Sequence, residues 1–220
     1  MKNNRLNQTR EEYIPHLLQD SGASIGVEIG VFKGHFSKTL LDGWDGTLFL
    51  VDPWRSIDED DYLDSTNNRH HESPLQDTVN SIEGYEDRAI MIRSFSHQAV
   101  DLFSDNSLDF VYVDGNHAYE YVKQDLEIWW PKLKSGGFMC GHDYLLFDWN
   151  ASPNIPNTKN KYIFADGERW MAKSSIDGNE DIKYAGVFGV NPAVNEFIEF
   201  KELQMDLTSD WNSSYIIRKP

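Results

Sequence analysis

The chain has 220 residues, of which 36 are acidic and 20 are basic, and its formal net charge is −16. This balance argues against nucleic acid as a partner, because phosphate binders gather Lys and Arg on one surface. No apolar run reaches the length of a membrane span, and the first residues lack the pattern of a secretory signal. The length predicts one domain over 1–220. The single cysteine, Cys140, rules out an internal disulfide, which predicts a reducing compartment, the cytoplasm.

Helices and strands are expected to alternate along the chain. A first helix over 9–20 begins at Thr9, with Glu12 placed for a capping box, and Pro15 is expected to interrupt or kink it. This alternation, with strands that are apolar throughout, predicts an α/β fold: a doubly wound, mostly parallel sheet covered by helices on both faces. Strands are expected at 25–30, 47–52, 89–94, 107–114, 136–144, 203–208 and 214–220, and further helices at 35–41, 74–85, 96–103, 118–133 and 189–203.

Three segments stand outside this alternation. Residues 1–23 form an N-terminal helical segment ahead of the first strand of the sheet. The acidic stretch 55–73 and the long stretch 145–184 show no clear period, which is typical of functional loops. We therefore expect both to act as substrate or lid loops within a single domain.

A tight turn lies in the segment VEIGVFKGHFS, between the first apolar strand and the helix that follows it. Gly30 and Gly34 bracket the turn, and Phe32 occupies the middle position, where a dinucleotide site needs a third glycine. Glu28 would repel a diphosphate and suits an ammonium group. The turn therefore disfavours a NAD-dependent oxidoreductase, although a purely structural turn remains an alternative.

Carboxylates follow the other predicted strands at the same edge of the sheet. Asp52 lies 22 residues after Gly30, the distance at which an acid meets ribose hydroxyls. Asp114 and Asp143 end two further strands, and paired carboxylates in a cleft attract a hard divalent cation. His117 is placed to act as a general base, or else to cap the next helix.

Four motifs carry a family resemblance when they are taken in chain order: VEIGVFKG, LVDPW, SLDFVYVDGNH and SGGFMCGHDY. Over residues 24–144 the chain resembles class I S-adenosylmethionine-dependent methyltransferases, and more narrowly the branch of the macrocin and mycinamicin sugar O-methyltransferases. The resemblance implies a seven-stranded sheet with an antiparallel last strand. It also implies S-adenosylmethionine as cosubstrate, with its methionine end at the glycine turn and its ribose on Asp52.

The resemblance also implies roles for individual residues. Asp114, His142 and Asp143 become candidate ligands of Mg²⁺ or Mn²⁺, although His142 stands where an acid is expected and imidazole suits Mn²⁺ better. His117 becomes the general base. Trp54 either covers the adenine or packs in the core, and Ser94 and Ser96 lie near the adenine by position. The candidate cosubstrate-binding residues are Glu28, Gly30, Gly34, Asp52, Trp54, Ser94, Ser96 and Asp114.

These observations predict a methyltransferase that acts on a hydroxyl of a sugar or glycosylated small molecule, with a divalent metal ion. One alternative is a metal-independent methyltransferase with another small acceptor. A second alternative, from outside the enzymes, is a catalytically silent S-adenosylmethionine-binding protein. The expected partners include neither nucleic acid nor membrane, and a homo-oligomer is left open.

Overall fold

The computed structural model describes residues 4–55, 72–117, 119–144, 163–165, 169–173, 183–185, 189–210 and 212–220. The two stretches expected to contact the acceptor, 55–73 and 145–184, therefore lie largely outside the described residues. Among the described residues, none of the helices combines the length and the apolar character that crossing a membrane requires.

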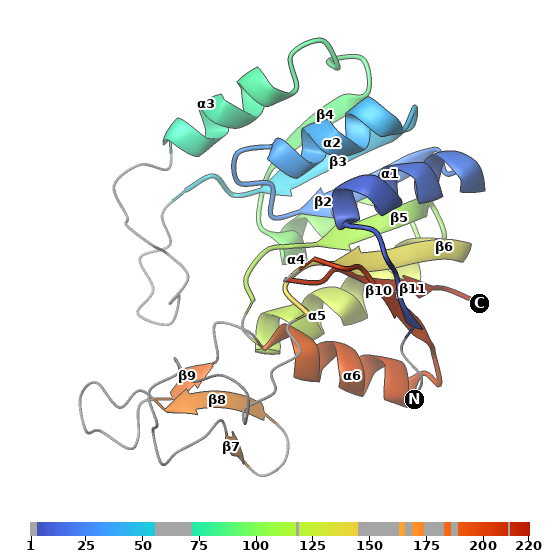
Figure 1. Ribbon diagram of the computed structural model, residues 1–220. Coiled ribbons are helices and arrows are strands. Elements are labelled where there is room, and N and C mark those ends of the chain that lie inside the picture. Colours follow the sequence, from blue (N-terminus) through green and yellow to red (C-terminus); the bar gives the residue numbers. More distant parts are fainter. Residues whose placement is uncertain are drawn as a thin grey trace.

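The core of the molecule is an eight-stranded sheet with the order β1-β10-β11-β6-β5-β2-β3-β4 (Figure 1). Strands β6, β5, β2, β3 and β4 run parallel to one another, whereas β11 is antiparallel to both of its neighbours. The predicted doubly wound, mostly parallel sheet with an antiparallel last strand is confirmed. The strands are β1 Asn4–Arg5, β2 Ile25–Ile29, β3 Thr47–Asp52, β4 Ala89–Arg93, β5 Leu108–Val113, β6 Leu133–Gly141, β10 Met205–Leu207 and β11 Tyr215–Arg218.

The number of strands exceeds the expected seven because the two-residue strand β1 pairs in parallel with β10. A separate antiparallel sheet is formed by β7 Ile163–Ala165, β8 Arg169–Lys173 and β9 Lys183–Ala185. These three strands fall in the stretch that was expected to be irregular. The sequence there lacks a clear period-2 pattern, so these strands were not predicted from it.

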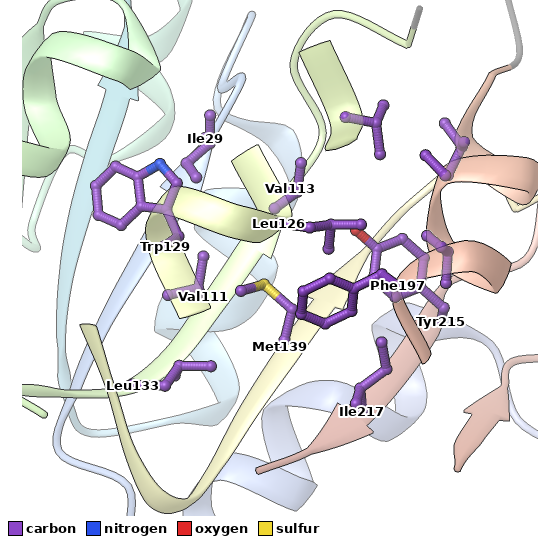
Figure 2. Close-up of a cluster of buried hydrophobic side chains, with 14 of the residues drawn as sticks. Ile29, Val111, Val113, Leu126, Trp129, Leu133, Met139, Phe197, Tyr215 and Ile217 are labelled. Atoms are coloured by element: carbon purple, nitrogen blue, oxygen red, sulfur yellow. The ribbon is translucent and has the colours of Figure 1, made fainter. Parts of the chain in front are cut away.

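Helices cover both faces of the large sheet (Figure 1). On one face α1 and α2 pack over a cluster that includes Leu18, Leu40 and Trp44. On the other face α5 and α6 pack over a cluster that includes Trp129, Met139, Phe197 and Tyr215 (Figure 2). The helices are α1 Arg10–Ser21, α2 His35–Gly43, α3 Glu72–Ser81, α4 Ser96–Ala99, α5 Tyr119–Trp129 and α6 Val190–Phe200, with 3₁₀ turns at Val100–Leu102 and Trp130–Lys132.

Helix α1 begins as its sequence predicted. The Thr9 hydroxyl accepts a hydrogen bond from the Glu12 amide, and the Glu12 carboxylate accepts one from the Thr9 amide, which completes a capping box. Of the two effects expected of Pro15, an interruption or a kink, the interruption is wrong, since the helix continues to Ser21. Pro15 is buried against α2, where Gly43 leaves room for it: a Cβ at Gly43 would lie 2.7 Å from the Pro15 Cβ. This packing offsets the backbone hydrogen bond that proline cannot donate.

Candidate active site

The turn between β2 and α2 is built from three residues with positive φ. Gly30, Phe32 and Gly34 have φ values of 84°, 53° and 74°. A Cβ at Gly30 would lie 2.0 Å from the carbonyl oxygen of Asp114, so the close approach of this turn to the end of β5 requires glycine. The Phe32 side chain is 63% exposed. Gly30 therefore lets the turn lie against the end of β5, at the edge where a ligand of an open parallel sheet binds, whereas Gly34 lies against Thr78 and Ser81 of α3.

Asp52, at the end of β3, organises the backbone of this turn. One carboxylate oxygen accepts hydrogen bonds from the amides of Val31 and Phe32, at 2.9 and 3.0 Å, and the other accepts the Trp54 amide at 2.7 Å. Asp52 is thus placed beside the turn, as its spacing from Gly30 predicted. Its contact with a ribose stays a prediction.

Glu28 lies beneath the turn and is 1% exposed. Its carboxyl group accepts a hydrogen bond from the Ser37 hydroxyl. Burial raises the pKa of Glu28 to about 8, and the nearby charges of Asp114 and Asp52 act in the same direction, against the Ser37 hydrogen bond. The group is therefore largely protonated at neutral pH and inaccessible, so it is poorly placed for the ammonium contact that the sequence indicated.

Two of the residues considered for the adenine pocket are turned into the protein. Trp54 is 2% exposed, and its indole N–H donates to the Phe32 carbonyl at 3.0 Å. The Ser96 hydroxyl donates to the buried Asp125 carboxyl and accepts the indole N–H of Trp129 at 2.8 Å. For Trp54 the structure therefore shows the core packing that the sequence had left open.

Ser94 lies next to Asp52, because its amide donates to the Asp52 carbonyl at 3.1 Å. Its hydroxyl donates to the carbonyl of Phe95 at 3.2 Å. The residue therefore stands just beyond the carboxyl end of β4 and beside the end of β3, where its place in the sequence put it, and its contact with an adenine stays a prediction.

An acidic cluster with two histidines lies where β5 and β6 end. The His117 Nε2 atom is 3.0 Å from an Asp143 oxygen and 3.3 Å from an Asp114 oxygen. The His142 Nδ1 atom is 3.3 Å from Asp143 and 3.8 Å from Asp114. The four side chains that the sequence marked as catalytic or metal-ligating are therefore brought together.

Asp143 is the most enclosed member of this cluster and has a positive φ of 56°. Burial acts to raise the pKa of its carboxyl group, but the hydrogen bond from His142 and the charges of His117 and His142 outweigh burial, so the pKa lies below its usual value. The Asn212 amide donates to its second oxygen at 2.7 Å. Asp143 is therefore an oriented anion at neutral pH.

The cluster has the donor set of a divalent metal site. One ligand atom each from Asp114, His117 and Asp143 lies within 4.8 Å of the others. Two carboxylates and an imidazole suit Mn²⁺ or Fe²⁺ better than Mg²⁺, which prefers oxygen ligands throughout. The sequence indicated Asp114, His142 and Asp143 as the ligands. In the structure the compact group contains His117 in place of His142.

Arg10 is a residue of the site that the sequence did not reveal. Its Nη1 atom donates to Asp114 at 3.2 Å and to the hydroxyl of Tyr112 at 3.1 Å, and its guanidinium lies 4.6 Å above the centre of the Phe36 ring. Arg10 and Asp114 are 104 residues apart in the sequence. The first residue of a capped helix carries no signal of such a contact.

Comparison with known proteins identifies a family over the segment that carries this site. Residues 27–144 match the family model described as a methyltransferase domain. A stretch of 53 residues, 24% of the chain, is 40% identical to the uncharacterized protein y4gI of Sinorhizobium fredii. The chain spans 6% of that relative's length, so the match concerns a segment and not the whole protein.

Solved structures resemble the whole chain at low sequence identity. The O-methyltransferase TomG of Streptomyces achromogenes, involved in tomaymycin synthesis and solved in complex with SAM, is 14% identical, with a TM-score of 0.59 over 96% of this chain and 80% of that one. The SAH complex of an O-methyltransferase from Bacillus cereus is 14% identical, with 0.58 over 97% and 82%. SAH-bound PaMTH1, a methyltransferase of Podospora anserina, is 13% identical, with 0.60 over 96% and 78%. These likenesses establish the Rossmann-like methyltransferase fold.

Proposed function

The chain belongs to the methyltransferase domain family, and from this membership we propose that it transfers the methyl group of S-adenosylmethionine to a hydroxyl oxygen of a small molecule. The observation that carries the proposal is the convergence of Asp114, His117 and Asp143 at the carboxyl edge of the sheet, beside the glycine turn. A protein that only binds the nucleoside has no need of a base between two carboxylates. The segment matched by the family model contains all three residues.

The cosubstrate is proposed to lie across the turn between β2 and α2. Its ribose hydroxyls would donate to Asp52, whose carboxylate already fixes the turn through the amides of Val31 and Phe32. A nicotinamide dinucleotide is disfavoured because Phe32 stands where the backbone must approach a pyrophosphate. The acids around the turn would also repel a diphosphate.

The chemistry is a direct displacement at the methyl carbon. The acceptor oxygen forms its bond to that carbon while the carbon–sulfur bond breaks and leaves its electron pair on sulfur. The hydroxyl proton goes to the imidazole of His117, which lies at the same edge as the turn. A divalent ion held by Asp114 and Asp143 would bind the acceptor hydroxyl and lower its pKa.

The acceptor is proposed to be a sugar or a glycosylated small molecule. A sugar presents neighbouring hydroxyls, and two neighbouring oxygens can chelate one divalent ion. The ligand atoms of the described cluster come from the segments that follow β5 and β6. A chelating diol would complete the coordination of an ion that prefers more ligands than these side chains supply.

A metal-independent methyltransferase is a second candidate, and a specific contact favours it. The Arg10 guanidinium bonds to Asp114 at 3.2 Å, so one of the two carboxylates already has a cationic partner within the chain. His117 lies between the two carboxylates and can balance the other. On this alternative Asp114 orients the base and the ligands, and no ion is required.

One experiment separates these possibilities. The protein, dialysed against EDTA, is tested by thermal shift with S-adenosylhomocysteine, NAD, Mg²⁺ and Mn²⁺. Labelled S-adenosylmethionine is then offered with a panel of glycosylated acceptors and simple catechols. We expect stabilisation by S-adenosylhomocysteine but not by NAD, and transfer to a glycoside that EDTA abolishes and Mn²⁺ restores.

Other outcomes assign the alternatives. Full transfer in excess EDTA supports the metal-independent enzyme. Binding of S-adenosylhomocysteine with neither metal binding nor transfer to any acceptor supports a silent binding protein. Stabilisation by NAD and not by S-adenosylhomocysteine would overturn the assignment of S-adenosylmethionine as the cosubstrate.

A further inference from the structure

We propose that Arg10 binds the carboxylate at the amino-acid end of the cosubstrate through its second η nitrogen, an inference that rests on the proposed function. Arg10 is the first residue of α1, and it reaches the site from outside the matched segment 27–144. The resemblance to known families, which begins at residue 24, assigned it no role.

The position of the guanidinium is that of a ligand-binding group. In the order β6-β5-β2-β3 the chain proceeds outward in both directions from the boundary between β2 and β5. Ligands of open parallel sheets bind in the crevice at such a switch point, outside the carboxyl ends of the strands. Arg10 contacts Asp114 just beyond β5 and Phe36 in the first turn of α2, so it spans this boundary.

The Arg10 guanidinium is held at three points: its Nη1 atom, its Nε atom and one face of its plane. Nη1 donates to Asp114 and to Tyr112, Nε donates to Glu11 at 3.0 Å, and the plane lies over Phe36. Among the residues that the structure describes, none accepts a hydrogen bond from Nη2. The side chain is 19% exposed, so Nη2 is a pre-oriented donor in a mostly enclosed place.

The charge of the surroundings makes this donor necessary. An amino acid brings a carboxylate into an edge that already holds Asp52, Asp114 and Asp143, and such an anion needs a cation beside it. Two other basic side chains near this edge already have partners within the chain. Lys33 pairs with an acid of α3, and Arg93 donates to two backbone carbonyls in the segment after β3.

The position of Arg10 is itself well supported. Its backbone amide donates to the Asp210 carboxylate at 2.8 Å, and the Thr208 hydroxyl donates to the same oxygen at 2.7 Å. The capping box begun by Thr9 sets the direction in which the helix departs. Because the helix start is anchored, the guanidinium loses little freedom when a ligand binds, which favours affinity.

The test compares two nucleosides that differ in the group Arg10 would hold. S-adenosylhomocysteine carries the amino-acid carboxylate, whereas 5′-methylthioadenosine lacks the whole amino-acid end. Calorimetry is carried out with the parent, Arg10→Met and Arg10→Lys, and with Arg218→Met as a matched control. Arg218 is the exposed last residue of β11; it pairs with Phe138 of β6, on the far side from the carboxyl end of that strand.

We expect Arg10→Met to bind S-adenosylhomocysteine about 10- to 100-fold more weakly, the usual worth of hydrogen bonds to a charged group. Its affinity for 5′-methylthioadenosine should be unchanged. Arg10→Lys, which keeps the charge and loses the planar fork, should fall between the parent and Arg10→Met. Arg218→Met should match the parent with both nucleosides.

Three results would overturn the inference. An equal loss of affinity for both nucleosides would show that Arg10 acts on the turn or on Asp114. Unchanged affinity for both would show that Arg10 does not contact the cosubstrate. Arg10→Lys gives the same comparison if Arg10→Met does not fold. If the parent itself binds neither nucleoside, the proposed function fails and the inference falls with it.

Discussion

At the residue scale, His117 can serve either of two purposes. A general base needs a lone pair directed at the acceptor proton, whereas a metal ligand uses that lone pair on the ion. Its Nε2 atom lies 3.0 Å from Asp143 and 3.3 Å from Asp114, which suits a ligand. His142 approaches the same two acids through Nδ1 and could take the ligand position instead.

We predict that His117→Ala lowers turnover by about 10²–10⁴, the usual worth of a positioned acid or base. Affinity for S-adenosylhomocysteine should stay at the parental value, because the nucleoside site does not include the imidazole. Steady-state kinetics with saturating metal ion and calorimetry with the nucleoside check both points.

Titration with Mn²⁺ decides between the two roles, and His142→Ala is the matched control. If His117 is the base, His117→Ala keeps the parental metal affinity and His142→Ala loses it. The opposite pattern makes His117 the ligand. Turnover near the parental rate in His117→Ala would leave the residue as a helix cap.

The site could be predicted only where the strands dictate it. Asp114 and Asp143 follow buried parallel strands, and the carboxyl ends of such strands meet at one edge, so their convergence is a matter of topology. The same logic places Ser96 at that edge but does not tell which way its side chain points. Arg10 and Asn212 reach the cluster from a helix and a hairpin whose docking has no local sequence signal.

At the element scale, α4 and α5 are joined by a small buried network. Ser96 donates to Asp125, and the indole of Trp129 donates to Ser96. Burial raises the pKa of Asp125 to about 7, against the hydrogen bond from Ser96. The folded protein therefore keeps a proton on Asp125 at pH values where the unfolded chain has released it.

This proton makes the stability depend on pH. The contribution of Asp125 to the free energy of unfolding should fall as pH rises from about 4 to about 7 and should level above that, because the folded state binds this extra proton only in that window. Asp125→Asn carries no such proton and keeps an acceptor for Ser96. We predict that the variant is more stable than the parent at pH 8, by about 1–3 kcal/mol, and gains nothing at pH 4.

Urea denaturation at pH 4, 6 and 8 measures the difference between the two proteins. Asp101→Asn, at an exposed acid in the 3₁₀ turn after α4, is the control and should follow the parent. Parallel curves for Asp125→Asn and the parent would contradict the assignment of the pH dependence to Asp125.

Elements with a strong pattern were predicted well, and short elements were not. The strand at 47–52 has the predicted bounds because a continuous apolar run between turn residues has few alternatives. The helix expected at 96–103 is instead a four-residue helix followed by a 3₁₀ turn. The two-residue strand β1 is too short to show any period.

At the scale of the whole molecule, the dominant electrostatic feature is the net charge of −16. Repulsion among exposed carboxylates opposes the compact state, and salt screens it. The exposed ion pairs, such as Lys38 with Asp42, contribute little in return. Self-repulsion should therefore outweigh surface attraction at low ionic strength.

We predict that raising KCl from about 20 to about 500 mM increases Tm by a few degrees through this screening. Differential scanning fluorimetry in EDTA measures it, with choline chloride at equal ionic strength as the control for specific ion binding. A fall in Tm with both salts would mean that attractive pairs dominate.

The hairpin formed by β10 and β11 is attached to the start of α1, and this attachment affects the order in which parts of the protein mature during synthesis. The Ser209 amide bonds to the Gln8 carbonyl, Asp210 holds the start of α1, and Asn212 orients Asp143. A ribosome has to deliver the hairpin before any of these contacts can form, however early the parallel strands assemble. Contacts between such distant parts of a chain are slow to close. The candidate active site is therefore among the last regions to mature. A nascent chain that stops short of residue 212 would lack the Asn212 contact that orients Asp143.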